Sequence, residues 1–140
     1  MSKKNVHKLS SESEQSYSLL GISSHENDYR ISWALNEHLG FRFGKIENHT
    51  FFNPKFGETL AFSQYIFKND ENSHTYRLIS NRCDNGFLLE EYKNIDFFLL
   101  VDSIEKSQVQ QLVIQVKTIP FVSAVFPIDF GLLKNRSRLL

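Results

Sequence analysis

The stretch SYSLLGISSHENDYRISWALNEHLGFRF, residues 16–43, decides the fold of this chain. It begins with the apolar run Tyr17–Ile22, which has the length of a strand. Such a run is typical of an interior strand that is buried on both faces. A helix follows at once, and alternating aromatic residues then indicate a second strand over Phe41–Lys45. The stretch therefore predicts a β-α-β unit.

The helix of this unit is predicted from its two ends and its apolar stripe. Ser23 stands three residues before Glu26, which is the spacing of a capping box in which each side chain bonds the other residue's backbone amide. Gly40 can adopt the left-handed conformation that ends a helix. These signals place the helix over Ser24–Leu39. One face of it is apolar and holds Ile31, Ala34, Leu35 and Leu39.

Trp33 lies outside that apolar stripe, and Tyr29 lies one turn before it. A tryptophan in this position is either covered by another part of the chain or exposed as an anchor for a partner, because large aromatic side chains dominate interface energetics. Cover by the chain's own tails or loops is favoured, since large aromatic side chains rarely stay exposed without a use. The exposed alternative makes Tyr29 and Trp33 the interface candidates.

The rest of the chain continues the alternation of strands and helices. A loop is expected over Glu47–Glu58, because Pro54 and Gly57 interrupt its apolar pattern. A second helix is expected over Ile104–Thr118, with Ser103 as its cap. Four further strands are expected at Leu60–Phe67, Thr75–Ser80, Asp96–Val101 and Phe121–Phe126, and the first two form a hairpin through the polar turn Lys68–Ser73.

The apolar stripes of the two helices must be buried, and one face of the sheet can cover both. This predicts an α+β protein built as a two-layer sandwich with both helices on one face. The element order β-α-β-β-β-β-α-β, with right-handed crossovers, predicts a ferredoxin-like arrangement with an added hairpin. A chain of 140 residues that is 41% hydrophobic suits a single domain. We expect a polar tail at residues 1–14, one domain at 15–128, and an extension at 129–140 that docks its leucines on the domain.

Charge and hydropathy exclude several classes of partner. Sixteen lysines and arginines balance sixteen acidic residues, so no bulk field attracts nucleic acid or anionic lipid. The N-terminal residues lack the apolar segment of a signal peptide, and no run approaches the ~18 apolar residues of a membrane span. The single cysteine, Cys83, cannot form an internal disulfide, which suits a reducing compartment. We expect a cytoplasmic protein without a membrane partner.

The residue patterns of known catalytic and metal sites do not occur in this sequence. No two of the five histidines are spaced i, i+4 on an expected helix, so no metal site is predicted. The segment Gly21–Glu26 has neither the second glycine nor the lysine of a phosphate loop, and no serine lies in a G-x-S-x-G elbow. We predict no catalytic residues and no cofactor. The sequence leaves enzymatic activity open but favours a protein without it.

Ser23, Ser24 and His25 form a hydroxyl-rich segment at the expected start of the first helix. Free backbone amides at a helix N-terminus bind anions, so this segment is a candidate site for a carboxylate or phosphate metabolite. The structural alternative is a capped helix end without a ligand, and it is favoured because Glu26 completes the cap.

Nucleic-acid binding is disfavoured. An RNA-recognition motif has a similar element order, but it requires a basic residue and a glycine followed by aromatic residues at alternate positions. The strand Leu60–Phe67 reads LAFSQYIF, in which Phe62 and Tyr65 fall on opposite faces. The rings that would stack on bases are therefore not placed on one sheet face.

Three segments resemble a small bacterial family named IPExxxVDY: GISSHENDYRISWALNEHLGF (21–41), YRLISNRCDNGFLLEE (76–91) and IPFVSAVFPID (119–129). The motif that names the family is kept in part, with matches at Ile119, Pro120 and Val125 and departures at Phe121, Phe126 and Pro127. The resemblance implies a compact bacterial cytoplasmic domain, and it supplies no catalytic residues.

Two functions from different classes remain. The first is a non-enzymatic interaction module, most simply a homodimer, that associates through Tyr29 and Trp33 or through an open sheet edge. An unknown protein partner is the alternative to self-association. The second is a small-ligand sensor resembling an ACT-type regulatory domain, with an anionic metabolite bound near Ser23, Ser24 and His25. An enzyme comes third, because no pair of nucleophile and base can be placed.

Overall fold

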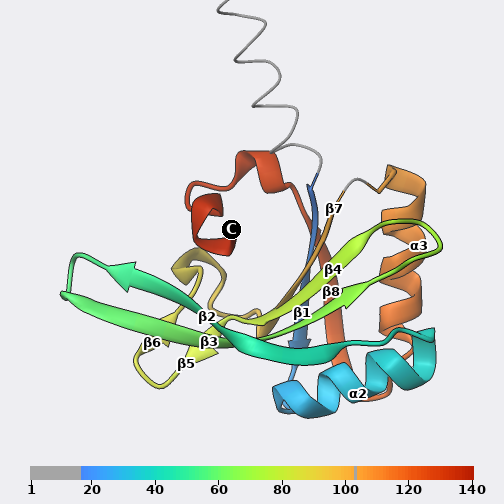
Figure 1. Cartoon of the computed structure of the whole chain (residues 1–140), viewed down its shortest axis with the longest axis horizontal. Coiled ribbons are helices and arrows are strands. Elements are labelled where there is room, and N and C mark those ends of the chain that lie inside the picture. Colours follow the sequence, from blue (N-terminus) through green and yellow to red (C-terminus); the bar gives the residue numbers. More distant parts are fainter. Residues whose placement is uncertain (1–16, 103) are drawn as a thin grey trace, which may run out of the picture.

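The protein is an α+β domain, as the sequence predicts, and the computed structural model describes residues 17–102 and 104–140 (Figure 1). Six strands form the main sheet, namely β1 (Tyr17–Ser24), β2 (Gly44–Asn53), β3 (Glu58–Lys68), β4 (Thr75–Ser80), β7 (Phe97–Asp102) and β8 (Val122–Ile128). They are all antiparallel to their neighbours, in the order β2-β3-β4-β7-β1-β8. The ferredoxin-like arrangement stays a prediction, because β3 and β4 separate β2 from β7.

Two helices, α2 (Asp28–Leu39) and α3 (Lys106–Lys117), pack on the same face of this sheet. Ile31 and Leu35 of α2 share one buried cluster with Leu112 and Val116 of α3 and with Leu20 of β1. The predicted apolar stripe of the first helix is confirmed in Ile31 and Leu35, and the second helix is amphipathic, as expected, with Leu112 and Val116 on its buried side. Neither helix, nor any other helix in the described ranges, is long and apolar enough to span a membrane.

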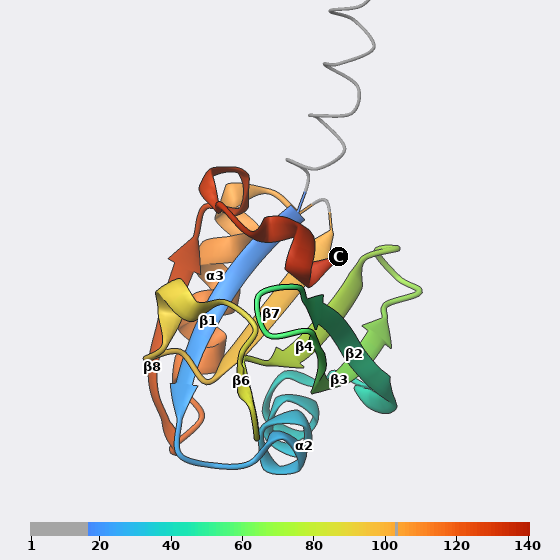
Figure 2. The same ribbon diagram turned by 90° about the vertical axis from the view of Figure 1, so that its left-hand side faces the viewer.

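The opposite face of the sheet is also covered, by short elements rather than by a third layer of helices. These elements are the hairpin of β5 (Arg82–Cys83) and β6 (Gly86–Phe87) and the 3₁₀ helices η1 (Glu90–Tyr92), η2 (Phe130–Leu132) and η3 (Arg136–Leu139). Figure 2 views the sheet from this side, with α3 behind the strands. Leu133 and Leu139 are buried there, whereas Leu132 and Leu140 are exposed, so the predicted docking of the C-terminal leucines holds for two of the four. The two-layer prediction omitted this cover.

The predicted start of the first helix is wrong. The helix begins at Asp28, and the side chain of Asn27 accepts a hydrogen bond from the Arg30 amide as its cap. Ser23 and Ser24 belong to β1 instead, so the capping box of Ser23 and Glu26 does not form. The other end is as predicted, because Gly40 has a left-handed φ of 71° and its amide bonds the Asn36 carbonyl.

The predicted strand over Phe41–Lys45 and the loop over Glu47–Glu58 are also wrong. Strand β2 begins only at Gly44 and runs to Asn53, and the turn to β3 is confined to the residues around Pro54 and Gly57. The two strands form a long hairpin that projects from the body of the domain in Figure 1. Phe51 lies opposite Leu60 and Phe52 opposite Thr59 across this hairpin, and such pairs of apolar and β-branched residues stabilise extended strands.

The start of the second helix also differs from the prediction. Ser103, the expected cap, lies outside the described residues. The helix α3 begins at Lys106, and Glu105 and Gln108 form a capping box in which each side chain accepts a hydrogen bond from the other residue's backbone amide. The predicted strands at Leu60–Phe67 and Thr75–Ser80 and their hairpin are confirmed by the pairing of β3 with β4.

Candidate functional site

The helix α2 presents the two interface candidates on its outer surface. Tyr29 is 68% exposed and Trp33 is 46% exposed. They lie one turn apart on the side of the helix that faces away from the sheet, so the two rings belong to one surface. The described residues leave nearly half of Trp33 uncovered, although cover by the chain was the favoured prediction.

This surface rests on a helix that is held at both ends. The Tyr65 hydroxyl of β3 donates to the Asp28 carboxylate at 3.2 Å. Burial, and after it the charge of Asp28, raise the pKa of Tyr65, so the phenol keeps its proton and remains a donor at neutral pH. At the other end, the Asn36 side chain accepts from the Phe43 amide at 2.8 Å and donates to the Phe43 carbonyl at 3.2 Å. The orientation of α2 is therefore fixed against the sheet.

Charged side chains flank the aromatic pair. Arg30 and Glu37 are both exposed. The Arg30 guanidinium lies over the Phe121 ring, 5.4 Å from its centroid, which restrains that side chain next to Trp33. Within residues 17–102 and 104–140, neither Arg30 nor Glu37 takes part in an ion pair. Both charges are therefore available to a partner.

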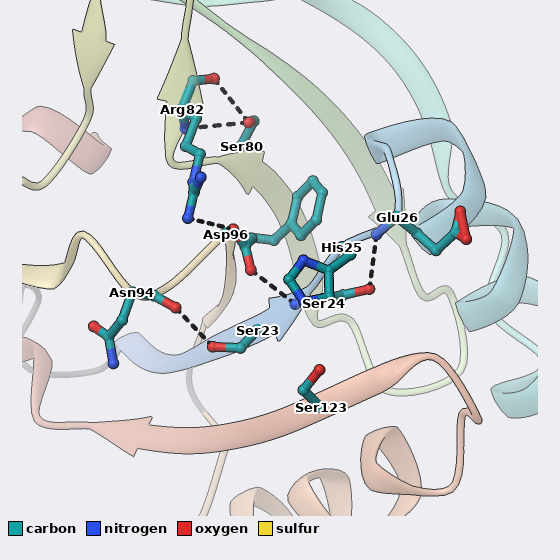
Figure 3. Close-up of a pocket in the computed structure, with 10 residues that line it drawn as sticks. Ser23, Ser24, His25, Glu26, Ser80, Arg82, Asn94, Asp96 and Ser123 are labelled. Carbon is teal, nitrogen blue, oxygen red and sulfur yellow. Dashed lines mark hydrogen bonds and ion pairs between the residues drawn. The ribbon is translucent and has the colours of Figure 1, made fainter.

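The predicted ligand residues Ser23, Ser24 and His25 line a cavity of about 430 Å³ (Figure 3). The cavity lies at the end of β1, rather than at the start of the helix where the anion site was expected. The neighbouring Glu26 also lines it, and the other lining residues come from distant parts of the chain, namely Ser80, Arg82, Asn94, Asp96, Phe97 and Ser123. The structure therefore brings the predicted residues together, but without free helix amides.

The hydroxyls of Ser23 and Ser24 already have partners in the chain. The Ser23 hydroxyl donates to the Asn94 carbonyl at 2.8 Å, and the Ser24 hydroxyl donates to the Phe121 carbonyl at 2.7 Å. The Ser24 amide donates to the Asp96 carboxylate at 2.8 Å. These bonds hold the end of β1 against its neighbours. A ligand would have to compete with them, which weakens the case for a binding role of the two hydroxyls.

The charges around the cavity do not favour an anion. The Arg82 guanidinium is paired with the Asp96 carboxylate at 2.9 Å. Glu26 adds a second carboxylate to the lining, although Figure 3 shows its side chain turned away from that ion pair. His25 is the remaining titratable side chain of the lining, and it is exposed to solvent. Because two carboxylates stand against one guanidinium, the cavity offers no excess of positive charge.

Sequence reasoning missed the residues that complete this cavity, above all Arg82, Asn94 and Asp96. Arg82 lies in the two-residue strand β5, in a segment whose sequence is typical of a turn, and Asn94 and Asp96 precede β7. Polar residues are usual in such places, so no local pattern separates these three from ordinary loop residues. Only the antiparallel pairing of β1 with β7 brings Asp96 beside Ser24. That pairing depends on the strand order, which the local sequence does not specify.

Within the described ranges, no three His, Cys, Asp or Glu side chains lie close enough together to hold a metal ion. Among the described residues, Arg82 pairs with Asp96, and the His74 imidazole lies 3.6 Å from the Asp102 carboxylate, with which it forms an ion pair only when protonated. These two pairs lie apart from each other, because Asp96 precedes β7 and Asp102 ends it. Cys83 is a free, half-buried thiol in β5.

The geometry therefore offers two candidate surfaces, the outer face of α2 and the cavity at the end of β1. Comparison with models of known protein families finds no match to this chain, and a search of curated proteins finds no significantly similar sequence. The resemblance to the IPExxxVDY family accordingly stays a prediction from the sequence.

Proposed function

We propose that this protein is a non-enzymatic interaction module that self-associates, and that the outer face of α2 is its contact surface. The observation that carries the proposal is the exposure of Trp33, the chain's single tryptophan, beside the still more exposed Tyr29. Tryptophan and tyrosine are the residue types that most often dominate binding energy at interfaces. Their burial against a partner would remove a costly apolar surface from water.

The rigid attachment of α2 supports the same function. Binding is weakened whenever loops and side chains must be ordered at the interface. The hydrogen bonds of Asp28 with Tyr65 and of Asn36 with Phe43 fix the helix before a partner arrives. The contact surface is therefore preorganised, and little ordering would be required on association.

The sheet edges support association less well than the helix face does. The edge strand β8 carries Pro127, which has no backbone N–H to offer to another strand. The other edge strand, β2, has a register shift between Ile46 and His49 and carries Lys45 at its start. Bulges and lysines are the usual means by which edge strands avoid pairing with other chains. We therefore assign the contact to α2 and not to an edge.

We also interpret the strand order as a ferredoxin-like sheet with the β3–β4 hairpin inserted. Without that hairpin the order becomes β2-β7-β1-β8, in which β7 and β8 flank β1 and are joined through α3. Two split β-α-β units related in this way are the pattern of that fold. A likeness of fold alone carries no function, so the proposal rests on the surface and not on the topology.

A small-ligand sensor is the second candidate, because the cavity at the end of β1 does gather Ser23, Ser24 and His25. Its charges suit a neutral or cationic polar ligand better than the anionic metabolite that the sequence predicted. Citrate and phosphate are suitable anionic probes. If either raises the melting temperature of the full chain and His25→Ala abolishes the shift, the sensor replaces the interaction module.

The experiment that tests the interaction module compares solution mass by light scattering after size-exclusion chromatography, over a concentration series. With increasing concentration, the solution mass of wild-type protein should rise toward twice the 16.4 kDa of one chain. Trp33→Ala should stay at the monomer mass, and circular dichroism should show that it remains folded. The matched control is Ile114→Ala on α3, which removes an apolar side chain of similar exposure, 60%, and should behave as wild type. A Trp33→Ala protein with the wild-type mass at every concentration contradicts the proposal.

A further inference from the structure

The exposed face of α2 has a charge pattern that is complementary to itself. At 3.6 residues per turn, Arg30 and Glu37 lie about 60° and about 40° from Trp33, on the same side of the helix. Tyr29 lies about 40° away on the other side. Arg30 and Glu37 are roughly 10 Å apart along the axis, and Trp33 lies near the midpoint between them. One long edge of the face therefore carries a cation and an anion placed symmetrically about the tryptophan.

Such an arrangement fits a twofold axis. A twofold axis that passes between two helices and is perpendicular to both makes them antiparallel and keeps each side chain on its own edge of the interface. With the axis beside Trp33, Arg30 of one copy reaches the level of Glu37 of the other copy, and the reverse contact forms at the same time. Because an isologous interface repeats each contact, one complementary pair becomes two ion pairs.

We infer that two copies of this chain associate through antiparallel α2 helices about a twofold axis beside Trp33, with Arg30 of each copy paired to Glu37 of the other. This inference rests on the proposed self-association and adds its geometry. The two Trp33 side chains form the apolar centre of the contact, and the ion pairs lie at its rim. Charges at the rim of an interface contribute mainly to register and partner choice. Here the two ion pairs favour the antiparallel arrangement of the helices over a parallel one.

Several features of α2 make a second copy the occupant of this surface. Neither charge forms an ion pair inside the described chain, and Arg30 is already held beside Trp33 by the Phe121 ring. The whole chain has a formal net charge of zero, so two copies approach without bulk repulsion. Figure 1 shows α2 at one end of the domain with no other described element beyond it, which leaves room for a partner helix.

Charge exchange tests this geometry, because it leaves the apolar centre unchanged. Arg30→Glu places two carboxylates against each other at both contacts, and Glu37→Arg does the same with two guanidinium groups. Each variant alone should dimerise at least about tenfold more weakly than wild type, since like charges at an interface are strongly unfavourable. The double variant Arg30→Glu/Glu37→Arg restores both pairs and should recover dimerisation. Both residues are exposed, so the variants should keep the wild-type circular dichroism spectrum.

The decisive arm mixes equal amounts of the two single variants and identifies the species by native mass spectrometry, which separates the copies because their masses differ. In the mixed pair, the carboxylate introduced at position 30 faces the guanidinium introduced at position 37, and the unchanged Arg30 faces the unchanged Glu37. Both contacts are then complementary, so a 1:1 heterodimer should form where neither variant forms a homodimer. If the single variants dimerise as well as wild type, the antiparallel geometry is overturned. The proposed self-association fails separately, if wild-type protein keeps the monomer mass at every concentration, and the α2 surface fails if Trp33→Ala dimerises as wild type does.

Discussion

Ile95 lies against Gly21 so closely that a Cβ on the glycine would overlap the Cδ1 atom of the isoleucine. The same Cβ would lie 3.1 Å from Cδ1 of Ile128. Gly21 is in the middle of β1, and Ile95 ends the segment that covers the outer face of the sheet before β7 begins. The missing side chain at Gly21 is thus what lets this segment pack directly on the strand.

Gly21→Ala should therefore destabilise the protein, by about 1–3 kcal/mol, which is the usual cost of overpacking a filled core. The measurement is urea unfolding at equilibrium. Ile95→Val removes the overlapping Cδ1 atom, so the double variant should recover part of the loss.

Gly44→Ala is the matched control for Gly21→Ala, because a Cβ at Gly44 meets no described atom within 4 Å and its φ is not positive. It should change the free energy of unfolding by less than about 0.5 kcal/mol. Equal effects of the two alanine substitutions would show that the contact with Ile95 does not constrain β1.

The C-terminal segment should contribute to stability through one buried leucine. Leu139 is 0% exposed in the outer cluster, whereas Leu132 in the same segment is 81% exposed. Leu139→Ala should cost about 2–5 kcal/mol, the range for a buried leucine truncated to alanine. Leu132→Ala should be nearly neutral. Thermal or urea unfolding of the two variants gives the comparison, and similar losses in both would mean that the segment is not docked as described.

His49 should make the docking of this segment sensitive to acid. Its Nε2 atom is hydrogen-bonded to the Arg138 carbonyl, and its Nδ1 atom lies 3.4 Å from the Arg77 guanidinium, which also donates to the Leu139 carbonyl. Burial, more than the nearby Arg77 charge, lowers the pKa of His49 from its ordinary value of about 6.5. Neutral His49 can donate to the carbonyl and accept from Arg77 at the same time, but the protonated ring cannot accept.

The sign of the pH effect follows from this lowered pKa. As the pH falls below about 6.5, the unfolded chain binds a proton at His49 before the folded chain does, so the folded state loses stability. His49→Gln cannot titrate, and its stability should fall less steeply than that of wild type between about pH 7 and pH 5. Urea unfolding at several pH values measures both slopes. Parallel slopes would remove His49 from the account of acid sensitivity.

The strands and helices with strong apolar patterns could be predicted from the sequence, and their ends could not. Tyr17–Ile22 was expected as a strand, but β1 continues to Ser24 because Asp96 and Phe121 bond the second serine. Those partners lie far along the chain, so the local capping pattern of Ser23 and Glu26 was misleading. Serine occurs both at strand ends and at helix caps. Here the hydrogen bonds to distant residues placed Ser24 in the strand.

In the candidate sites, too, the features set by the local sequence could be predicted, and those set by distant residues could not. Tyr29 and Trp33 could be placed on one helix face from spacing alone, since helical geometry is local. Their exposure depends on which segments pack beside α2. The sequence analysis favoured cover of Trp33 by other parts of the chain, but the described residues leave this side chain 46% exposed. The cavity at the end of β1 needed Arg82 and Asp96 from other strands and loops, and its balance of charge could be assessed only once those residues were in place.

The fluorescence of Trp33 over a dilution series tests the central claim most directly, because the chain has no other tryptophan and the signal reports on this surface alone. If the outer face of α2 is the self-association surface, raising the protein concentration should shift the emission to shorter wavelength and reduce quenching by acrylamide, as the indole leaves water. Emission and quenching that stay constant while light scattering records a dimer would place the contact elsewhere and contradict the account.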